Sequence, residues 1–421
     1  MPASMEPPAR APRGDARLLV AAAAAILLVT MGARQSLGLF VAPLNRATGL
    51  GIVAISLAMA VGQFVWGLTQ PIFGAVADRF GTRRVLAAGA VTLAAGAALT
   101  TVVSSELGLV LAIGVLFAAG AAAGSFAILI GATARRLAPE KRAFASGVIN
   151  AGGSLGQFLL APLSQLFISS FGWIVAMYAL AVAALATIPL ARPLVLTPHA
   201  DEQPGAPGAA PAGSVLLREQ LRAAARDRSY WCLHLGFFTC GFHIAFLVTH
   251  LPGEVNLCAL PASVAAASLA IIGLANVAGS LGIGWLGGRY RMKWLLFFVY
   301  STRALAIGAY LVMPRTPLIF YMFAAVLGLT WLSTVPPTAG LVGKLFGVRY
   351  LATLFGLTLL SHQIGGFFGA WLGGIALVTF GDYGWMWYAD MSLALAAALV
   401  NLPIREAPLT RAAVKALAES A

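Results

Sequence analysis

The sequence predicts an all-α membrane protein of twelve transmembrane helices in two pseudo-symmetric six-helix bundles. Three features predict this fold: an apolar composition, a succession of apolar segments of transmembrane length, and a repeat that relates the two halves. Of the 421 residues, 60% are hydrophobic and 10% are charged, and the mean hydropathy is +0.88. Because a soluble domain usually carries about 25% charged residues, this composition indicates a chain that lies in a bilayer.

The apolar segments follow one another along the chain. A helix needs about 20 apolar residues to cross roughly 30 Å of hydrocarbon. The predicted spans of the first half are residues 18–42, 52–76, 84–104, 108–132, 143–168 and 172–193. Those of the second half are residues 230–252, 263–287, 294–313, 317–341, 350–378 and 384–404. The first segment is too long for the core of a signal peptide, so we expect it to be retained as a span.

A polar segment separates the two sets of spans. It begins with Pro, Gly and Ala in no regular pattern, a composition that cannot bury much apolar area. Its second part places Leu217, Leu221 and Ala225 at four-residue intervals, with arginines on a neighbouring face. We expect an amphipathic helix at the cytoplasmic membrane surface; a solvated helix is the alternative. The predicted domains are residues 1–191, a linker at 192–229, and residues 230–421.

The basic residues predict the orientation of the spans. Of the 27 Lys and Arg residues, only Arg46 and Arg315 fall in the loops expected on the far side of the membrane. Both termini are therefore predicted to be cytoplasmic, in a bacterial inner membrane. The net charge of +13 also favours contact with anionic lipids. Nucleic-acid binding is not expected, because the charge is divided among short loops and no soluble module carries it.

A basic hairpin between the second and third spans recurs in the second half. It runs from Gly74 to Arg84, and a degraded copy follows the eighth span, where Gly74 aligns with Gly284 and Arg79 with Arg289. The copy has Gly288 where the first hairpin has an acid. Such internal repeats are typical of secondary transporters.

A second match at a nearly constant offset supports the duplication. Gly147, Gly156 and Phe158 in the fifth span align with glycines and a phenylalanine of the eleventh span, Gly356, Gly365 and Phe367. Two loops and two helices thus repeat in the same order. The sequence therefore predicts two related halves.

The hairpin reads GxxxDRxGxRR, which resembles the loop that major facilitator superfamily proteins carry between their second and third helices. The matching residues are Gly74, Asp78, Arg79, Gly81, Arg83 and Arg84, with Arg289 in the second copy. The resemblance implies a charge contact between the halves when the inner gate is closed, which would bias two conformations. Cations that only enforce topology are the alternative.

Four longer segments are similar to a bacterial branch of that superfamily close to the monocarboxylate and oxalate/formate transporters. They are GARQSLGLFVAPL (32–44), CGFHIAFLVTHLP (240–252), GLTWLSTVPPT (328–338) and SHQIGGFFGAWLGG (361–374). The resemblance implies twelve helices, alternating access, and a small organic anion moved with a proton or exchanged. Those relatives place a carboxylate-binding arginine in span eight, where this chain has Asn276 and no cation.

Two arginines lie inside predicted spans, where a charge is costly enough to need a function or a partner. Arg34 is in span one, which the resemblance places at the central cavity, and its guanidinium could bind a carboxylate. Alternatively, Arg34 reaches the outer headgroups or pairs with Asp390 in span twelve. Arg303 lies in the peripheral span nine, which favours a tie between helices or a position near the inner surface.

Two histidines near the middle of spans are candidates for proton coupling. His243 is in span seven and His362 in span eleven. Histidine titrates near physiological pH, and carboxylates are absent from the middle of the cavity-lining spans in the sequence. A neutral histidine that only hydrogen-bonds a neighbouring helix is the alternative for each.

Uncharged side chains complete the predicted substrate site. Asn150 and Gln157 in span five, Gln363 in span eleven and Trp331 in span ten are expected to line the cavity. Further polar candidates are Gln63, Thr330, Ser333 and Thr334. Each of them could instead bond a neighbouring helix. The pair Pro336 and Pro337 is expected to let span ten bend.

The sequence thus predicts a monomeric, proton-linked secondary transporter of a small organic anion. The partners expected are that anion, protons and membrane lipids. A proton-driven exporter of amphiphilic or drug-like compounds is the alternative. No catalytic residue, metal site or cofactor is predicted, because the three cysteines have no metal-ligand spacing and no nucleophile has a base at a recognisable spacing.

Overall fold

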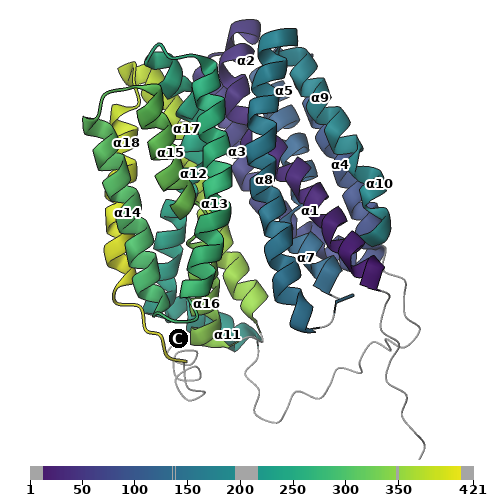
Figure 1. The fold of residues 1–421 in the computed structure, drawn as a ribbon, viewed down its shortest axis with the longest axis vertical. Coiled ribbons are helices and arrows are strands. Elements are labelled where there is room, and N and C mark those ends of the chain that lie inside the picture. Colours follow the sequence, from purple (N-terminus) through teal and green to yellow (C-terminus); the bar gives the residue numbers. More distant parts are fainter. Residues whose placement is uncertain (1–12, 135, 138, 195–216, 348–349, 409–421) are drawn as a thin grey trace, which may run out of the picture.

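The computed structural model describes residues 13–134, 136–137, 139–194, 217–347 and 350–408. These residues form helices and connecting turns, with no strand among them. Two helical bundles stand side by side, one built from the first half of the chain and the other from the second (Figure 1). The beginning of α1 and the described end of the chain lie at the same end of the molecule, which we call the termini end (Figure 1).

The first half of the chain supplies ten helices to the N-terminal bundle, among the residues described. They are α1 (Arg13–Gln35), α2 (Val41–Thr48), α3 (Ile52–Phe80), α4 (Thr82–Thr100), α5 (Glu106–Leu109), α6 (Ala118–Ala123), α7 (Phe126–Ala134), α8 (Pro139–Phe171), α9 (Trp173–Leu185) and α10 (Thr187–Leu190). A π-helical segment, Val110–Phe117, connects α5 to α6.

The second half supplies the C-terminal bundle and a short helix before it. These helices are α11 (Leu217–Arg226), α12 (Arg228–Leu257), α13 (Ala262–Leu286), α14 (Met292–Val312), α15 (Pro317–Thr330), α16 (Val335–Phe346), α17 (Leu351–Phe380) and α18 (Gly384–Asn401).

The predicted twelve-helix membrane fold is confirmed. Nine helical stretches of the described residues are long and apolar enough to cross a membrane. The other three spans correspond to α4, α8 and α18, which pack against them within the bundles. Spans one, four, six and ten each consist of more than one helical piece.

Span ten is broken at residues 331–334, between α15 and α16; we call these residues the unwound segment. Pro336 and Pro337 lie in the first turn of α16 and have no backbone N–H to continue the hydrogen-bond ladder. The N–H of Val335 bonds to the carbonyl of Leu332, so the chain turns more tightly here than in an α-helix. The bend expected from the prolines is therefore a true interruption of the helix.

Glycines bring equivalent helix pairs together in the two bundles. A side chain at Gly156 of α8 would collide with the backbone carbonyl of Leu28 on α1. Its counterpart in the sequence repeat, Gly365 of α17, has the same relation to the carbonyl of Phe238 on α12. The repeat therefore corresponds to one helix-packing contact used twice.

The two bundles touch mainly away from the termini end. There, Gly38 of the first span lies against the backbone of Val248 on α12, and Gly374 of α17 lies against Ser56 of α3. Nearer the termini end, four glycines on the helices between the bundles have open space beside them: Gly74, Gly147, Gly284 and Gly356. The structure thus keeps the bundles together at one end.

The linker helix differs from its expected orientation. Residues 195–216, which include Ser214, lie outside the described part of the chain. In α11, Gln220, Ala223 and Ala224 are buried against the C-terminal bundle, whereas Leu217, predicted on the apolar face, is 39% exposed. Gln220 fixes this orientation by donating from Nε2 to the carbonyl of Phe346 at 3.1 Å.

Candidate functional site

Arg34 lies near the end of α1 and is held by two residues of α3. Its guanidinium donates a hydrogen bond to Oε1 of Gln63, and its Cζ is 4.3 Å from the centre of the Trp66 ring. Among the described residues, no carboxylate forms an ion pair with Arg34. The side chain is half-buried, so a cation is held in place inside the molecule with an amide and an aromatic face as its neighbours.

The opposite bundle brings His362 and Gln363 to the same level. Gln363 of α17 fills the space beside Gly67, and Gln63 lies beside Gly366, so α3 and α17 interlock through their glutamines. Gln363 is buried, with Nε2 3.2 Å from Nδ1 of His362. Within the part of the chain that the structure describes, Oε1 of Gln363 has no hydrogen-bond partner, and neither has the indole nitrogen of Trp66.

We call these five residues, Arg34, Gln63, Trp66, His362 and Gln363, the central polar site. A small cavity adjoins it, lined by Arg34 and Gln63 and otherwise mostly by apolar side chains of α3, α12, the turn after α1 and the π-helical segment. One cation with unpartnered amide and indole groups beside it can accept an anion that carries a short apolar part.

Gln157 lies at the interface of α8 and α13. It is fully buried, and neither its amide nitrogen nor its amide oxygen has a partner. The contact of Gly32 with Gly156 places it at the level of Arg34 on the neighbouring helix. Asn150 is half-buried about two turns closer to the termini end, so the structure does not bring it to Arg34.

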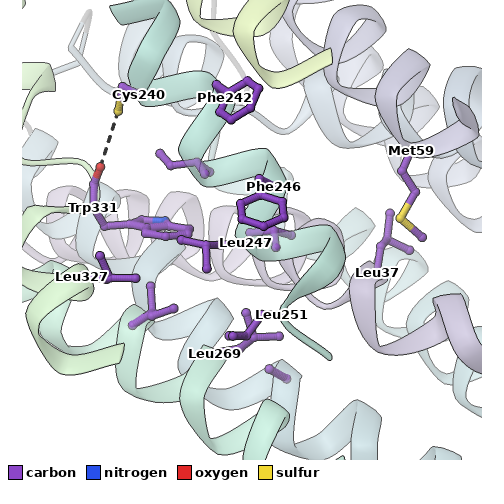
Figure 2. Close-up of a cluster of buried hydrophobic side chains, with 14 of the residues drawn as sticks. Leu37, Met59, Cys240, Phe242, Phe246, Leu247, Leu251, Leu269, Leu327 and Trp331 are labelled. Atoms are coloured by element: carbon purple, nitrogen blue, oxygen red, sulfur yellow. Dashed lines mark hydrogen bonds between the residues drawn. The ribbon is translucent and has the colours of Figure 1, made fainter. Parts of the chain in front are cut away.

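Trp331 lies inside the C-terminal bundle and away from the central polar site. It is fully buried in the unwound segment, where its ring packs beside Leu247 and Leu327 (Figure 2). Its carbonyl accepts a hydrogen bond from Sγ of Cys240 at 3.7 Å (Figure 2). In this conformation Trp331 belongs to the packed core of the bundle.

Arg303 of α14 is completely buried beside the same segment. Its Nη2 donates to the carbonyls of Thr330 and Trp331, at 2.8 and 3.3 Å. These carbonyls end α15 and lack the partners that a continuous helix would give them. The structure therefore confirms the expectation that Arg303 connects two helices, here α14 and α15, and excludes a position near the surface.

His243 of α12 is paired with Asp390 of α18. Their Nδ1 and Oδ2 atoms are 2.6 Å apart, and both side chains are 0% exposed. The alternative that Asp390 pairs with Arg34 is wrong, because the histidine occupies it. The sequence offered one signal of this pair, an acid in the middle of an otherwise apolar span.

Asn276 of α13 connects the unwound segment to the N-terminal bundle. Its Oδ1 accepts the backbone N–H of Leu332 at 3.0 Å, and its Nδ2 donates to Oγ of Ser154 on α8 at 2.9 Å. Sequence reasoning noted Asn276 only as the place of a missing arginine, and it missed Trp66. A polar residue with a glycine three positions away on either side, Gly273 and Gly279, was the available signal for Asn276.

The basic hairpin is a tight connection between α3 and α4. Gly81 has φ of +92°, a backbone conformation that favours glycine. Arg79, Arg83 and Arg84 are exposed, and the side chain of Asp78 lies outside the described part of the structure. In the second copy, Cζ of Arg289 is 3.8 Å from the centre of the Trp285 ring. The gating role of both hairpins stays a prediction.

Comparisons with known proteins agree with this architecture. A model of the Major Facilitator Superfamily matches residues 23–370. The chain belongs to the major facilitator superfamily. Among solved members of this fold, the D-xylose-proton symporter superimposes with a TM-score of 0.73 at 14% identity, over 93% of this chain and 98% of that one.

Two relatives are similar to this chain in sequence over most of their length. Monocarboxylate transporter 11 of Mus musculus is 27% identical over 418 residues, which cover 95% of this chain and 90% of the relative. The oxalate:formate antiporter of Oxalobacter formigenes is 25% identical over 370 residues, covering 85% of this chain and 84% of the relative. The predicted resemblance to these transporters is confirmed.

Proposed function

We propose that this chain moves a small organic anion, such as a monocarboxylate, across a bacterial inner membrane by proton-linked alternating access. One observation carries the proposal: Arg34 is fixed by Gln63 and Trp66 at the level where α3 meets α17 of the other bundle, with no carboxylate partner among the described residues. A cation in such a place needs an anion, and the similarity to a monocarboxylate transporter and an oxalate:formate antiporter supports an organic anion.

The proposed orientation places the termini end in the cytoplasm, because the basic loops gather there. The open space beside Gly74, Gly147, Gly284 and Gly356 supports access to the site from that side. A closed contact of the bundles at the opposite end supports the same direction of access. Movement of the bundles would then expose Arg34 to the other side.

Uptake by reconstituted vesicles tests the role of Arg34. We expect the wild type to accumulate labelled pyruvate, lactate or oxalate under an inward proton gradient, and Arg34→Gln to lose that uptake. The glutamine keeps a polar side chain but cannot neutralise a carboxylate. Arg46→Gln is the matched control, because Arg46 is an exposed cation in the same bundle. Equal uptake by wild type and Arg34→Gln would overturn the proposal.

The apolar lining of the cavity beside Arg34 favours one second candidate. Leu37, Met59, Ile113 and Phe117 outnumber its polar groups, which suits an amphiphilic cargo. If the vesicles move none of the anions but extrude a lipophilic dye under a proton gradient, export of amphiphilic compounds is the function.

A further inference from the structure

The C-terminal bundle buries a group of charged side chains that the central polar site does not use. Arg303, His243 and Asp390 are each 0% exposed, and they come from α14, α12 and α18. We call them the buried charge cluster. Charges inside a membrane bundle are expensive, so a cluster that only fills space would be replaced at little cost by apolar side chains.

The geometry of the pair leaves one basic atom available. With 2.6 Å between Nδ1 of His243 and Oδ2 of Asp390, a hydrogen must lie between two atoms that would otherwise repel each other. A neutral histidine with its hydrogen on Nδ1 carries a lone pair on Nε2. That Nε2 is buried, and neither it nor Oδ1 of Asp390 has a hydrogen-bond partner among the described residues.

The titratable neighbours of His243 form a nearly neutral surrounding. Asp390 of α18 is bonded to His243, Arg303 of α14 is the second charged side chain near it, and Tyr300 and Cys240 lie beside Arg303. From α17 the titratable residue is His362, which packs on Phe237 of α12, and α13 carries none. The positive charge of Arg303 and the negative charge of Asp390 cancel while His243 is neutral.

We propose that the His243–Asp390 pair is the proton-binding site of this transporter, and that the unwound segment links it to the movement of the two bundles. The inference rests on the proposed transport function. A hydronium ion gives its proton to the Nε2 lone pair, so that an N–H bond forms, one O–H bond of the hydronium breaks and a water molecule is released. The cluster then carries one net positive charge, which an anion in the central polar site balances.

A continuous set of contacts leads from the pair to the other bundle. The His243 and Trp331 rings are in edge contact, with centres 5.7 Å apart. Trp331 begins the unwound segment, which Arg303 holds by its carbonyls. The next residue, Leu332, bonds to Asn276, which bonds in turn to Ser154 of the N-terminal bundle. An imidazolium at His243 repels Arg303 and so acts on the break between α15 and α16.

A titration without substrate tests the proton site directly. Purified protein carrying isotope-labelled histidine is titrated in detergent, and the five histidines are followed by nitrogen NMR. We expect one buried imidazole to become protonated, and this signal to be absent from His243→Gln. In Asp390→Asn it should also be lost, because the amide cannot balance an imidazolium. His250→Gln is the matched control, since His250 is buried on the same helix but bonds a carbonyl, that of Ala370.

Transport separates this inference from the proposed function. Vesicles containing His243→Gln or Asp390→Asn should lose pyruvate accumulation under a proton gradient while keeping pyruvate-for-pyruvate exchange. Asn276→Leu should keep the histidine titration and lose the accumulation; unchanged accumulation in this variant would refute the link through the unwound segment.

Two results would overturn the proton site. One is a titration that is the same in wild type and His243→Gln, and the other is normal gradient-driven accumulation by both pair variants. If the wild type moves no anion, the proposed function fails, and the NMR titration still decides whether the pair binds a proton.

Discussion

In the N-terminal bundle, the buried polar side chains among the described residues are hydroxyls and amides of Ser, Thr and Gln. The C-terminal bundle, built on the same helix contacts, buries Arg303, His243 and Asp390 as well. The one inner cation of the first bundle, Arg34, instead faces the neighbouring bundle and is half-buried. Duplication therefore conserved the packing of the bundles, while their charges came to serve different purposes.

The sharpest way to break this comparison is to remove one cation from each bundle. Arg303→Met should lower the free energy of unfolding by about 3 kcal/mol, because it removes two charge-assisted hydrogen bonds to the buried carbonyls of Thr330 and Trp331. Arg34→Met should lower it by less than about 1 kcal/mol, because no buried charge is left unpaired. Unfolding in detergent mixtures, followed by circular dichroism, measures both. Equal losses would show that the two arginines do not differ in kind.

The shared packing can be tested with two pairs of equivalent glycines. Gly156→Ala and Gly365→Ala should each cost about 1–3 kcal/mol of stability, because the added methyl group meets a backbone carbonyl of the neighbouring helix. Gly147→Ala and Gly356→Ala have open space and should be neutral or stabilising by up to about 1 kcal/mol. The same unfolding measurement applies. A cost in only one bundle would contradict the equivalence of the two contacts.

The smallest effect expected is at a charge pair of the C-terminal bundle whose acid is buried and whose arginine is exposed. Asp227 and Arg405 form a bond of 2.8 Å, and the Arg405 side chain is 44% exposed. Asp227→Asn should lower stability by less than about 1 kcal/mol, and the difference should vanish at high salt. Asparagine can still accept the N–H of Tyr230 at the start of α12, as Asp227 does at 3.0 Å. A larger loss would mean that the exposure of one partner does not weaken a charge pair in this bundle.

The fold could be predicted from the sequence because its signals are local. A span such as 384–404 is recognised from its own residues, and it corresponds to Gly384–Asn401 in the structure. The repeat added the relation between halves, and Gly156 and Gly365 then had a common physical role. Prolines 336 and 337 likewise identified the bend of span ten.

The candidate site could be predicted only in part, because its partners are distant in the chain. His243 and Asp390 are separated by 147 positions, and nothing local to either indicates the other. Arg34 could be identified as unusual from its span alone, but its contacts with Gln63 and Trp66 depend on how α1 and α3 cross. Trp331 was expected to line the cavity because span ten does so in the family. The break in span ten instead directs the Trp331 side chain into the core of the C-terminal bundle.

The bonds from Arg303 to the end of α15 have an evolutionary consequence. Lipid offers no hydrogen-bond donors to an interrupted helix, so the carbonyl of Thr330 depends on this guanidinium, and that of Trp331 depends on it together with the weak donor Sγ of Cys240. A chain without the arginine would stay stable only if span ten became a continuous helix. That change requires residues with a backbone N–H in place of Pro336 and Pro337. Across homologous chains, the arginine and the proline pair should therefore be gained and lost together.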